Sequence, residues 1–144
     1  MDIAKLTKLG RRALPLKTCG AVIVAAGSAS RMGGIDKVMV PLGGEPMIVR
    51  TVRAFQQCEA IREIVIVTRP DLIRAISDRC AGMDKVRAVV AGGANRQASV
   101  WLGLNALSEG IQLAAIHDGA RPLISGAVID RTVRAANSYG AAAP

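Results

Sequence analysis

A loop of small residues that carries two basic side chains follows the first apolar segment of this sequence. Residues 22–37 read VIVAAGSASRMGGIDK, and the loop within them holds Arg31 and Lys37. Small side chains let backbone N–H groups approach an anion closely, and the two cations can neutralise part of its charge. The pattern therefore predicts a site for the phosphates of a nucleotide, although two merely exposed loop cations would leave the same pattern.

The spacing of this loop differs from two familiar phosphate-binding motifs. Five residues separate Gly27 from Gly33, and no Lys-Ser or Lys-Thr pair follows, so the loop is not a Walker A motif. A dinucleotide-binding fingerprint turns directly into a helix and places an acid at the end of the second strand, whereas here the sequence at that strand end is Val67-Thr68-Arg69, without an acid. These differences argue against an oxidoreductase.

A second loop, GGANRQASV, begins at Gly92. Ser99 stands near the expected start of a helix, where a serine hydroxyl commonly caps the first turn. Alternatively, the main chain at Gly93 and the Ser99 hydroxyl can recognise the polar edge of a pyrimidine base without an aromatic side chain. Arg96 is either a surface cation or a contact that fixes the loop, and these alternatives stay open on the sequence alone.

A third loop, IHDGARPLI, places Asp118 at the end of another apolar segment. A carboxylate there suits Mg²⁺ or the hydroxyls of a substrate, although it could also only cap a turn. Arg121 is suited to binding a phosphate group. His117 is the only histidine, and the sequence offers no recognisable triad or zinc site around it, which favours a structural role.

Four apolar segments rich in β-branched residues must position these loops. They are expected to form strands over residues 21–26, 63–68, 86–91 and 113–117. Helical patterns alternate with them: one with Pro46 as its first residue, one over residues 72–80 after Pro70-Asp71, one around Ser99 and one over residues 126–138.

This alternation predicts an α/β fold, namely a Rossmann-like, open and mostly parallel sheet with helices on both faces. Ligands of such sheets bind beyond the carboxyl ends of the strands, so the three loops should meet at one edge. Residues 139–144 have the character of a further strand that is just beginning.

Charge and cysteine content indicate the partners of the protein and its cellular compartment. Residues 1–18 hold five of the nineteen Lys and Arg side chains against one acid, which is half of the formal net charge of +8. We expect this segment to be a basic disordered leader and not a nucleic-acid arm, because it lacks aromatic residues. The cysteines, Cys19, Cys58 and Cys80, lack C-x-x-C spacing, which indicates reduced thiols and a cytoplasmic protein. No apolar run suggests a membrane partner.

Taken together, the segments AAGSASRMGG, Lys37, GGxxRxxSV and HDGARP resemble the 2-C-methyl-D-erythritol 4-phosphate cytidylyltransferases of non-mevalonate isoprenoid synthesis. The resemblance spans residues 19–144 and implies the CTP-binding portion of a cytidylyltransferase domain, with the fold of nucleotide-diphospho-sugar transferases, incomplete at its C-terminus. It implies a nucleotidyltransferase that moves a cytidylyl group from CTP to a sugar-alcohol phosphate and releases pyrophosphate. Mg²⁺ or another divalent cation would be the cofactor, and full-length members would form homodimers.

The resemblance also implies a role for each matching position. Arg31 and Lys37 would be the catalytic residues, stabilising charge around the α-phosphate. The residues that bind the nucleotide would be Ala25, Ala26, Gly27, Gly93 and Ser99, the last two selecting cytosine. The residues that face the acceptor would be Asp118, Gly119 and Arg121, with Asp118 also a candidate metal ligand.

Four positions depart from the family pattern. Ala29 stands where a second glycine is common, and Val38-Met39 stands where the pattern has Gln-Tyr. Asp36 replaces the usual proline before Lys37, and we expect its charge to weaken the positive field of the loop. Members of the family also continue well past residue 144, so we expect the chain to show weak turnover or none by itself.

Other functions remain open on the sequence. A ribitol-5-phosphate cytidylyltransferase would share the same three loops. A non-catalytic nucleotide-binding protein would need only the nucleotide half of the site. A basic nucleic-acid binder would use the leader, and its binding to DNA would depend steeply on salt.

Overall fold

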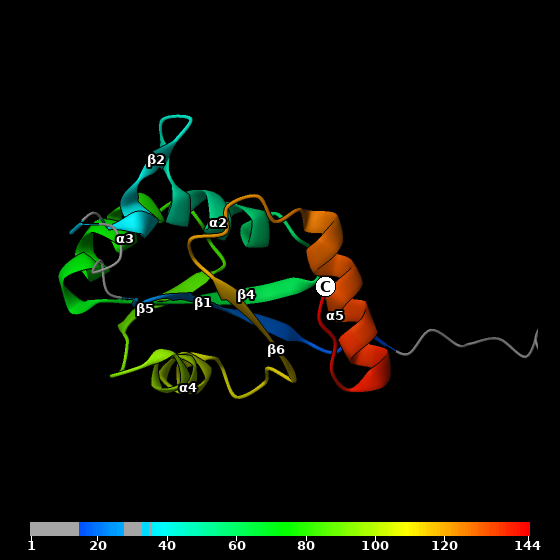
Figure 1. Ribbon diagram of the computed structural model, residues 1–144. Coiled ribbons are helices and arrows are strands. Elements are labelled where there is room, and N and C mark those ends of the chain that lie inside the picture. The colour runs from blue at the N-terminus through cyan, green and yellow to red at the C-terminus, as the bar shows by residue number, and fades with distance from the viewer. Residues whose placement is uncertain (1–14, 28–32, 35) are drawn as a thin grey trace, which may run out of the picture.

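A four-stranded parallel sheet forms the centre of the molecule (Figure 1). The computed structural model describes residues 15–27, 33–34 and 36–144. The strands, in spatial order, are β5 (Val86–Ala91), β4 (Ile61–Thr68), β1 (Cys19–Ala25) and β6 (Leu113–Asp118). Every pairing within this sheet is parallel, which confirms the predicted sheet and brings the carboxyl ends of the four strands to one edge. The predicted leader falls largely outside the described residues.

Helices cover both faces of this sheet, as predicted (Figure 1). One face carries α2 (Met47–Gln56), α3 (Ile73–Arg79) and α5 (Gly126–Tyr139). The other face carries α4 (Arg96–Ala106). The buried side chains of α2 recur at the spacing of a single helical stripe, which is why this segment folds as a helix against a sheet.

Burial on both faces explains the uninterrupted apolar sequence of β1. Ala21 faces the layer of α2 and α5, where it belongs to the same buried cluster as Phe55. Val22 faces α4 and packs in a second cluster with Val67. A side chain at Gly103 of α4 would collide with both of these valines, so glycine there lets the helix lie close to the sheet.

A short hairpin that the sequence analysis did not anticipate lies between the first loop and α2. It consists of β2 (Pro41–Leu42) and β3 (Glu45–Pro46), which pair antiparallel. The two turn residues, Gly43 and Gly44, have φ angles of +60° and +82°. Two-residue hairpin turns of this kind need positive φ at both positions, which glycine adopts without strain.

The helix starts at the two prolines differ from the prediction. Pro46 precedes α2 instead of being its first residue, because it pairs with Pro41 in the hairpin and its ψ of 142° is extended. α2 therefore begins at Met47. A 3₁₀ helix, η3 (Pro70–Leu72), takes up the start of the next predicted helix, and α3 begins only at Ile73.

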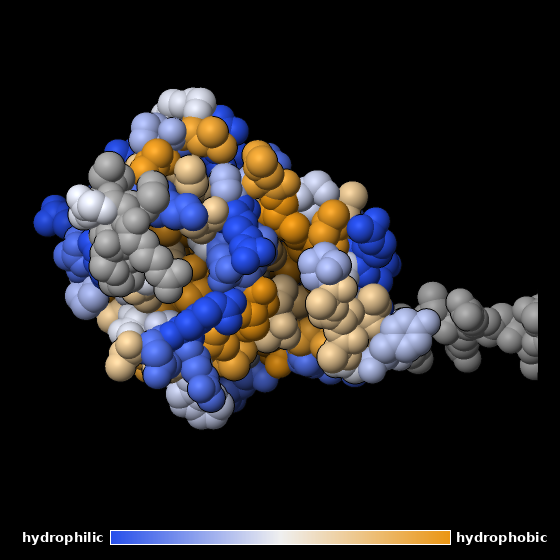
Figure 2. All heavy atoms as spheres, viewed as in Figure 1, coloured by the Kyte–Doolittle hydropathy of each residue, from blue (hydrophilic) through white to orange (hydrophobic). Residues whose placement is uncertain are grey.

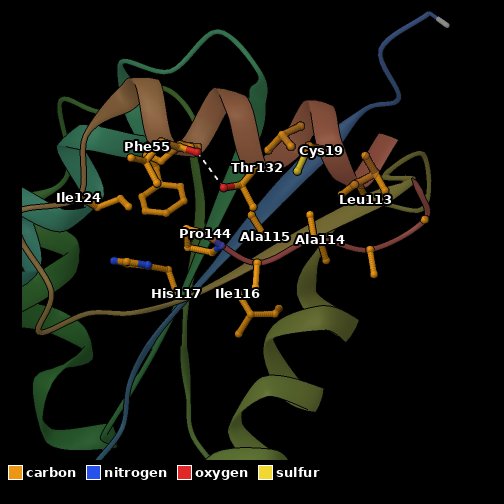
Figure 3. A pocket seen from close by; sticks show the side chains of 18 of the residues that line it. Cys19, Phe55, Leu113, Ala114, Ala115, Ile116, His117, Ile124, Thr132 and Pro144 are labelled. Carbon is orange, nitrogen blue, oxygen red and sulfur yellow. Dashed lines mark hydrogen bonds between the residues drawn. The ribbon is translucent and has the colours of Figure 1, made fainter. Parts of the chain in front are cut away.

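An apolar groove of about 520 Å³ runs along the outer edge of β6 (Figure 3). α5 forms one wall, and residues 140–144 lie along the groove without pairing to a strand, so the further strand expected there is not formed. In the described part of the chain, β6 pairs with β1 only. Figure 2 shows apolar side chains between hydrophilic ones on this side of the molecule.

Candidate nucleotide-binding site

Three of the strand ends bring the predicted loops together at the carboxyl edge of the sheet. β1 leads into Ala26 and Gly27, β5 into Gly92, and β6 ends at Asp118. The backbone N–H of Gly92 donates to the carbonyl oxygen of Thr68 at 2.7 Å, which holds the second loop against β4. The predicted convergence is confirmed for the described residues of all three loops.

Close packing between these loops depends on two glycines. A Cβ atom at Gly92 would overlap the side chain of Ala26 and lie 2.8 Å from the Ser99 Oγ. A Cβ atom at Gly119 would lie 3.0 Å from the Cβ of Ala25. The backbones of the second and third loops are therefore pressed against the small residues that end β1, so the predicted nucleotide-binding positions form one floor.

Ser99 lies in this floor, but it does not cap α4. Asn95 is the capping residue, since its side chain accepts a hydrogen bond from the N–H of Ala98 at 2.8 Å. Ser99 is one turn further along, only 2% exposed, and its Oγ accepts a hydrogen bond from the N–H of Gly93 at 3.1 Å. The capping interpretation of Ser99 is wrong, and the contact that exists links the two residues assigned to the base.

The third loop carries an ion-pair cluster of Arg96, Asp118 and Arg121, here called the Asp118 cluster. One carboxylate oxygen of Asp118 accepts from the Nη2 of Arg96 at 2.9 Å, and the other accepts from the Nε of Arg121 at 3.1 Å. Arg96 is thus a contact between loops and not a lone surface cation. Two guanidinium groups around one carboxylate leave the cluster with a net positive charge.

An open cavity of about 660 Å³ adjoins the Asp118 cluster, and His117 contributes to its lining. The imidazole ring packs against Phe55 with ring centroids 5.2 Å apart, and its Nε2 lies 3.2 Å from the carbonyl oxygen of Arg121. These contacts favour the structural role expected for His117. The cavity gives the positive cluster a space in which an anionic group can be bound.

Lys37 occupies the other side of the edge. It is exposed at the start of the 3₁₀ helix η2 (Lys37–Met39), and Val38 beside it is buried in the core. Asp36, the preceding residue, forms an ion pair with Arg69, which follows β4. Its Oδ2 lies 2.6 Å from the Nη2 of Arg69. Arg31, the other predicted catalytic residue, lies outside the described residues.

Arg69 is the residue of this edge that the sequence analysis did not assign to the site. It appeared there only as the residue that ends a strand. Its position directly after β4, at the edge where ligands of parallel sheets bind, was a usable signal. The partner at Asp36 was not predictable, because 32 intervening positions give no local spacing rule that joins them.

The thiols and carboxylates offer no metal site of their own in the described part of the chain. No group of three His, Cys, Asp or Glu side chains there could hold an ion. The three cysteines are free and buried, as expected, and burial raises the pKa of Cys19 and of Cys80 to about 11. Both thiols are therefore protonated near neutral pH.

The helices in the described part of the chain are too short or too polar to cross a membrane.

Comparison with known proteins identifies the family. The family described as IspD, 2-C-methyl-D-erythritol 4-phosphate cytidylyltransferase, matches residues 19–144. The chain belongs to the IspD family. A family member from Symbiobacterium thermophilum, also described as 2-C-methyl-D-erythritol 4-phosphate cytidylyltransferase, is 43% identical over 121 residues, which are 83% of this chain and 50% of that protein.

Solved structures agree with the fold of this IspD-family chain. The 4-diphosphocytidyl-2C-methyl-D-erythritol synthase of Anaerococcus prevotii is 30% identical, with a TM-score of 0.73 over 84% of this chain and 52% of that one. The Rv0371C protein of Mycobacterium tuberculosis, solved in complex with manganese, is 16% identical, with a TM-score of 0.62 over 86% of this chain and 60% of that one. The second likeness concerns the fold alone.

The chain spans about half the length of the curated relatives that it matches. The part that it matches includes the strands and loops that meet at the carboxyl edge of the sheet. The predicted family and fold class are thereby confirmed, while the roles assigned to single side chains remain predictions.

Proposed function

We propose that this chain carries the CTP-binding part of a 2-C-methyl-D-erythritol 4-phosphate cytidylyltransferase of isoprenoid precursor synthesis. The observation that supports this most directly is the contact of three loops at one sheet edge, in a chain that belongs to the IspD family. In the proposed reaction, a phosphate oxygen of the acceptor forms a bond to the α-phosphorus of CTP. The bond from that phosphorus to the bridging oxygen breaks, and pyrophosphate leaves.

The nucleotide would lie over the floor formed by the ends of β1 and β5. Ala25, Ala26 and Gly27 would approach the phosphates with their backbone, because no large side chain intervenes. Gly93 and Ser99 would select cytosine, since the hydrogen bond between them fixes a backbone group and a hydroxyl near one another. A base presents a fixed pattern of donors and acceptors, which two such fixed groups can recognise.

Positive charge would stabilise the transition state at phosphorus. Lys37 would supply it from the first loop, and Arg31 is proposed for the same role on the resemblance alone. The attacking and leaving oxygens both carry negative charge, and positioned cations are worth more in such a site than in water.

The acceptor would lie beside the Asp118 cluster. The net positive charge of that cluster and the adjacent cavity suit the phosphate of a sugar-alcohol phosphate. Asp118 would orient Arg121 and Arg96, and the backbone of Gly119 would face the same ligand. The remainder of an acceptor site would come from the half of the family's length that this chain does not span.

A divalent cation, Mg²⁺ in the first instance, would accompany CTP. The described residues do not form a full ligand set, and both oxygens of Asp118 already accept from arginines, which counts against that residue as a preformed metal ligand. Mg²⁺ bound mainly by triphosphate oxygens needs only one or two protein carboxylates. Such an ion would neutralise charge on the phosphates. The manganese complex of a protein of similar fold supports use of a divalent cation.

The same proposal implies a compartment, an oligomeric state and partners for the protein. The protein would work in the cytoplasm, in keeping with its free thiols, and full-length protein would form a homodimer. Its partners would be CTP and the sugar-alcohol phosphate, with neither nucleic acid nor membrane. Ribitol-5-phosphate as acceptor and a purely non-catalytic role are not favoured, because the relatives that match carry the methylerythritol name.

Calorimetric titration of the chain with CTP, UTP and ATP in the presence of Mg²⁺ tests the nucleotide part of this proposal. Cytosine presents an amino donor where uracil presents a carbonyl acceptor, so we expect CTP to bind at least about tenfold more tightly than UTP. Equal affinities would remove the role given to Gly93 and Ser99. Absence of binding by all three nucleotides would contradict the proposal as a whole.

An activity assay tests whether these residues hold the nucleotide part of the site without a complete acceptor part. With CTP and 2-C-methyl-D-erythritol 4-phosphate, we expect the 144 residues alone to release pyrophosphate weakly or not at all. Steady release at a rate typical of enzymes, about 1 per second or more, would show that these residues already hold a complete acceptor site.

A further inference from the structure

Arg69 connects two segments of the carboxyl edge that are far apart in the sequence. Its Nη2 donates to a carboxylate oxygen of Asp36 at 2.6 Å. Its Nε and Nη2 donate to the two oxygens of Asp71 at 3.1 and 2.8 Å. We call these three residues the Arg69 cluster. The planar guanidinium thus bridges both acids at once, which a lysine ammonium could not do with the same geometry.

The contact with Asp36 is the more buried of the two. The side chains of Arg69 and Asp36 are 27% and 21% exposed, whereas Asp71 is 62% exposed. Solvent screens a partly buried ion pair less than an exposed one, so the single hydrogen bond to Asp36 is less screened than the two hydrogen bonds to Asp71. This link joins the end of β4 to the first loop.

Asp36 lies directly before Lys37, the residue proposed to act on the α-phosphate. The carbonyl of Asp36 accepts a hydrogen bond from the N–H of Met39 at 2.9 Å, while its side chain makes no capping bond to η2. On the other side of Lys37, Val38 is 8% exposed and packs in the core. The backbone of Lys37 is therefore held from both sides, by an apolar contact and by Arg69.

Lys37 makes no ion pair with any residue in the described part of the chain, although an acid is its neighbour. Asp36 is paired with Arg69 instead. The expectation that Asp36 weakens the positive field of the loop stays a prediction, because Arg69 is shared with Asp71 and the three charges do not cancel.

We propose that Arg69 is a positioning residue that pairs with Asp36 and so keeps this carboxylate away from Lys37, leaving the Lys37 ammonium available to the phosphates of the nucleotide. The proposal rests on the proposed function, since it assumes that Lys37 contacts CTP. It assigns Arg69 no contact with the reacting atoms. It also accounts for how this chain tolerates an acid where the family pattern has proline.

The test is calorimetric titration of CTP with Mg²⁺ at low salt, on Arg69→Gln, Asp36→Asn and the double variant. Loss of Arg69 leaves Asp36 free to pair with Lys37, so we expect Arg69→Gln to weaken CTP binding roughly tenfold. Asp36→Asn removes the competing charge, and the double variant should bind within about twofold of the parent chain. If Arg69 only stabilised the fold, the added Asp36→Asn substitution would not restore CTP affinity.

Asp71→Asn provides the matched control. It removes an acid that pairs with the same guanidinium but does not neighbour Lys37, and it should neither change CTP affinity by more than about twofold nor rescue Arg69→Gln. Should Arg69→Gln fail to fold, Arg69→Lys takes its place, with an expected weakening of about threefold that Asp36→Asn again removes.

Lys37→Gln separates failure of this inference from failure of the proposed function. Unchanged CTP affinity in Lys37→Gln would remove Lys37 from the nucleotide site, and the role of Arg69 with it. A weakened Lys37→Gln together with an unchanged Arg69→Gln would overturn the role of Arg69 alone. Weakening by Arg69→Gln that Asp36→Asn does not relieve would also overturn it.

Discussion

Two ion-pair clusters lie at the same edge of the sheet and have opposite composition. In the Asp118 cluster, one carboxylate is shared by two arginines, and in the Arg69 cluster, one arginine is shared by two carboxylates. The first has a net positive charge and adjoins an open cavity of about 660 Å³. The second has a net negative charge, and Lys37 follows its Asp36 directly in the sequence.

This difference separates two ways of preparing a site for anions. The arginines of the Asp118 cluster are 62% and 73% exposed, so they can turn to a ligand while Asp118 keeps them in place. Arg69 is less exposed and already shared, so it is better suited to holding structure than to binding a ligand. The contrast agrees with the two proposals above, in which the first cluster would bind the acceptor and the second would position Lys37.

The floor between the two clusters should be the most sensitive position. In Gly92→Ala the new Cβ would overlap the side chain of Ala26 and approach the Ser99 Oγ. Overpacking of this kind costs about 1–3 kcal/mol of unfolding free energy, and we expect CTP binding to be lost with it. Chemical denaturation and calorimetry measure both effects.

Gly82→Ala is the control for this substitution, because a Cβ at Gly82 meets nothing within 4 Å. It should leave the unfolding free energy within about 0.5 kcal/mol of the parent. If Gly92→Ala were equally neutral, the two clusters would not share a packed floor, and they would have to be treated as independent.

Ser99→Ala tests whether base selection belongs to this floor or to either cluster. The substitution leaves the N–H of Gly93 without its acceptor, so we expect a loss of about 1 kcal/mol in stability. The preference for CTP over UTP should fall to about twofold or less if these groups read the base. Asn95→Ala removes the cap of α4 at a similar cost of about 1 kcal/mol, but should keep that preference. A preference lost equally in both variants would point to general loosening of the loop.

Charge removal compares the two clusters directly. Asp118→Asn and Asp71→Asn each remove one negative charge, yet only the first frees arginines beside the cavity. We expect Asp118→Asn to strengthen binding of inorganic pyrophosphate about threefold and to steepen its salt dependence, while Asp71→Asn leaves both nearly unchanged. Equal responses, measured by calorimetry at two salt concentrations, would mean that net charge alone matters and that the clusters do not differ in function.

The sequence predicted the parts of this arrangement that depend on local pattern. Alternating apolar segments and helical stripes predicted the parallel sheet with helices on both faces, and the edge where the loops meet followed from strand direction. The hairpin at Gly43-Gly44 was missed although its signal was present, because two-residue turns with positive φ favour such pairs. Pro46 was misplaced because the strand pairing that sets its ψ is a tertiary contact.

The partners of the charged residues could not be predicted in the same way. Arg96 and Asp118 are 22 positions apart, and Asp36 and Arg69 are 33 apart. No periodicity in a sequence relates residues at such distances, and either arginine could equally have remained in solvent. Chain direction shows which end of each strand they follow, and only the packed structure shows which acid each one meets.

The smallest expected effect concerns Asp71 and distinguishes the clusters by acid titration. The side-chain hydrogen bonds from Arg69 lower the pKa of Asp71 below its usual value of 3.8. A carboxyl group whose pKa is lowered by folding stabilises the folded state above the unfolded pKa, and that contribution disappears as the pH falls through the folded pKa. NMR titration of the Asp71 carboxyl carbon should therefore show a midpoint below 3.8 in the parent chain, moving up toward 3.8 in Arg69→Gln. Arg134→Gln, which breaks an exposed pair with Asp130 on α5, should not move the midpoint of Asp71. A midpoint at the usual value in the parent would mean that Arg69 is not shared between its two acids in solution, and that the Arg69 cluster is a single ion pair with Asp36.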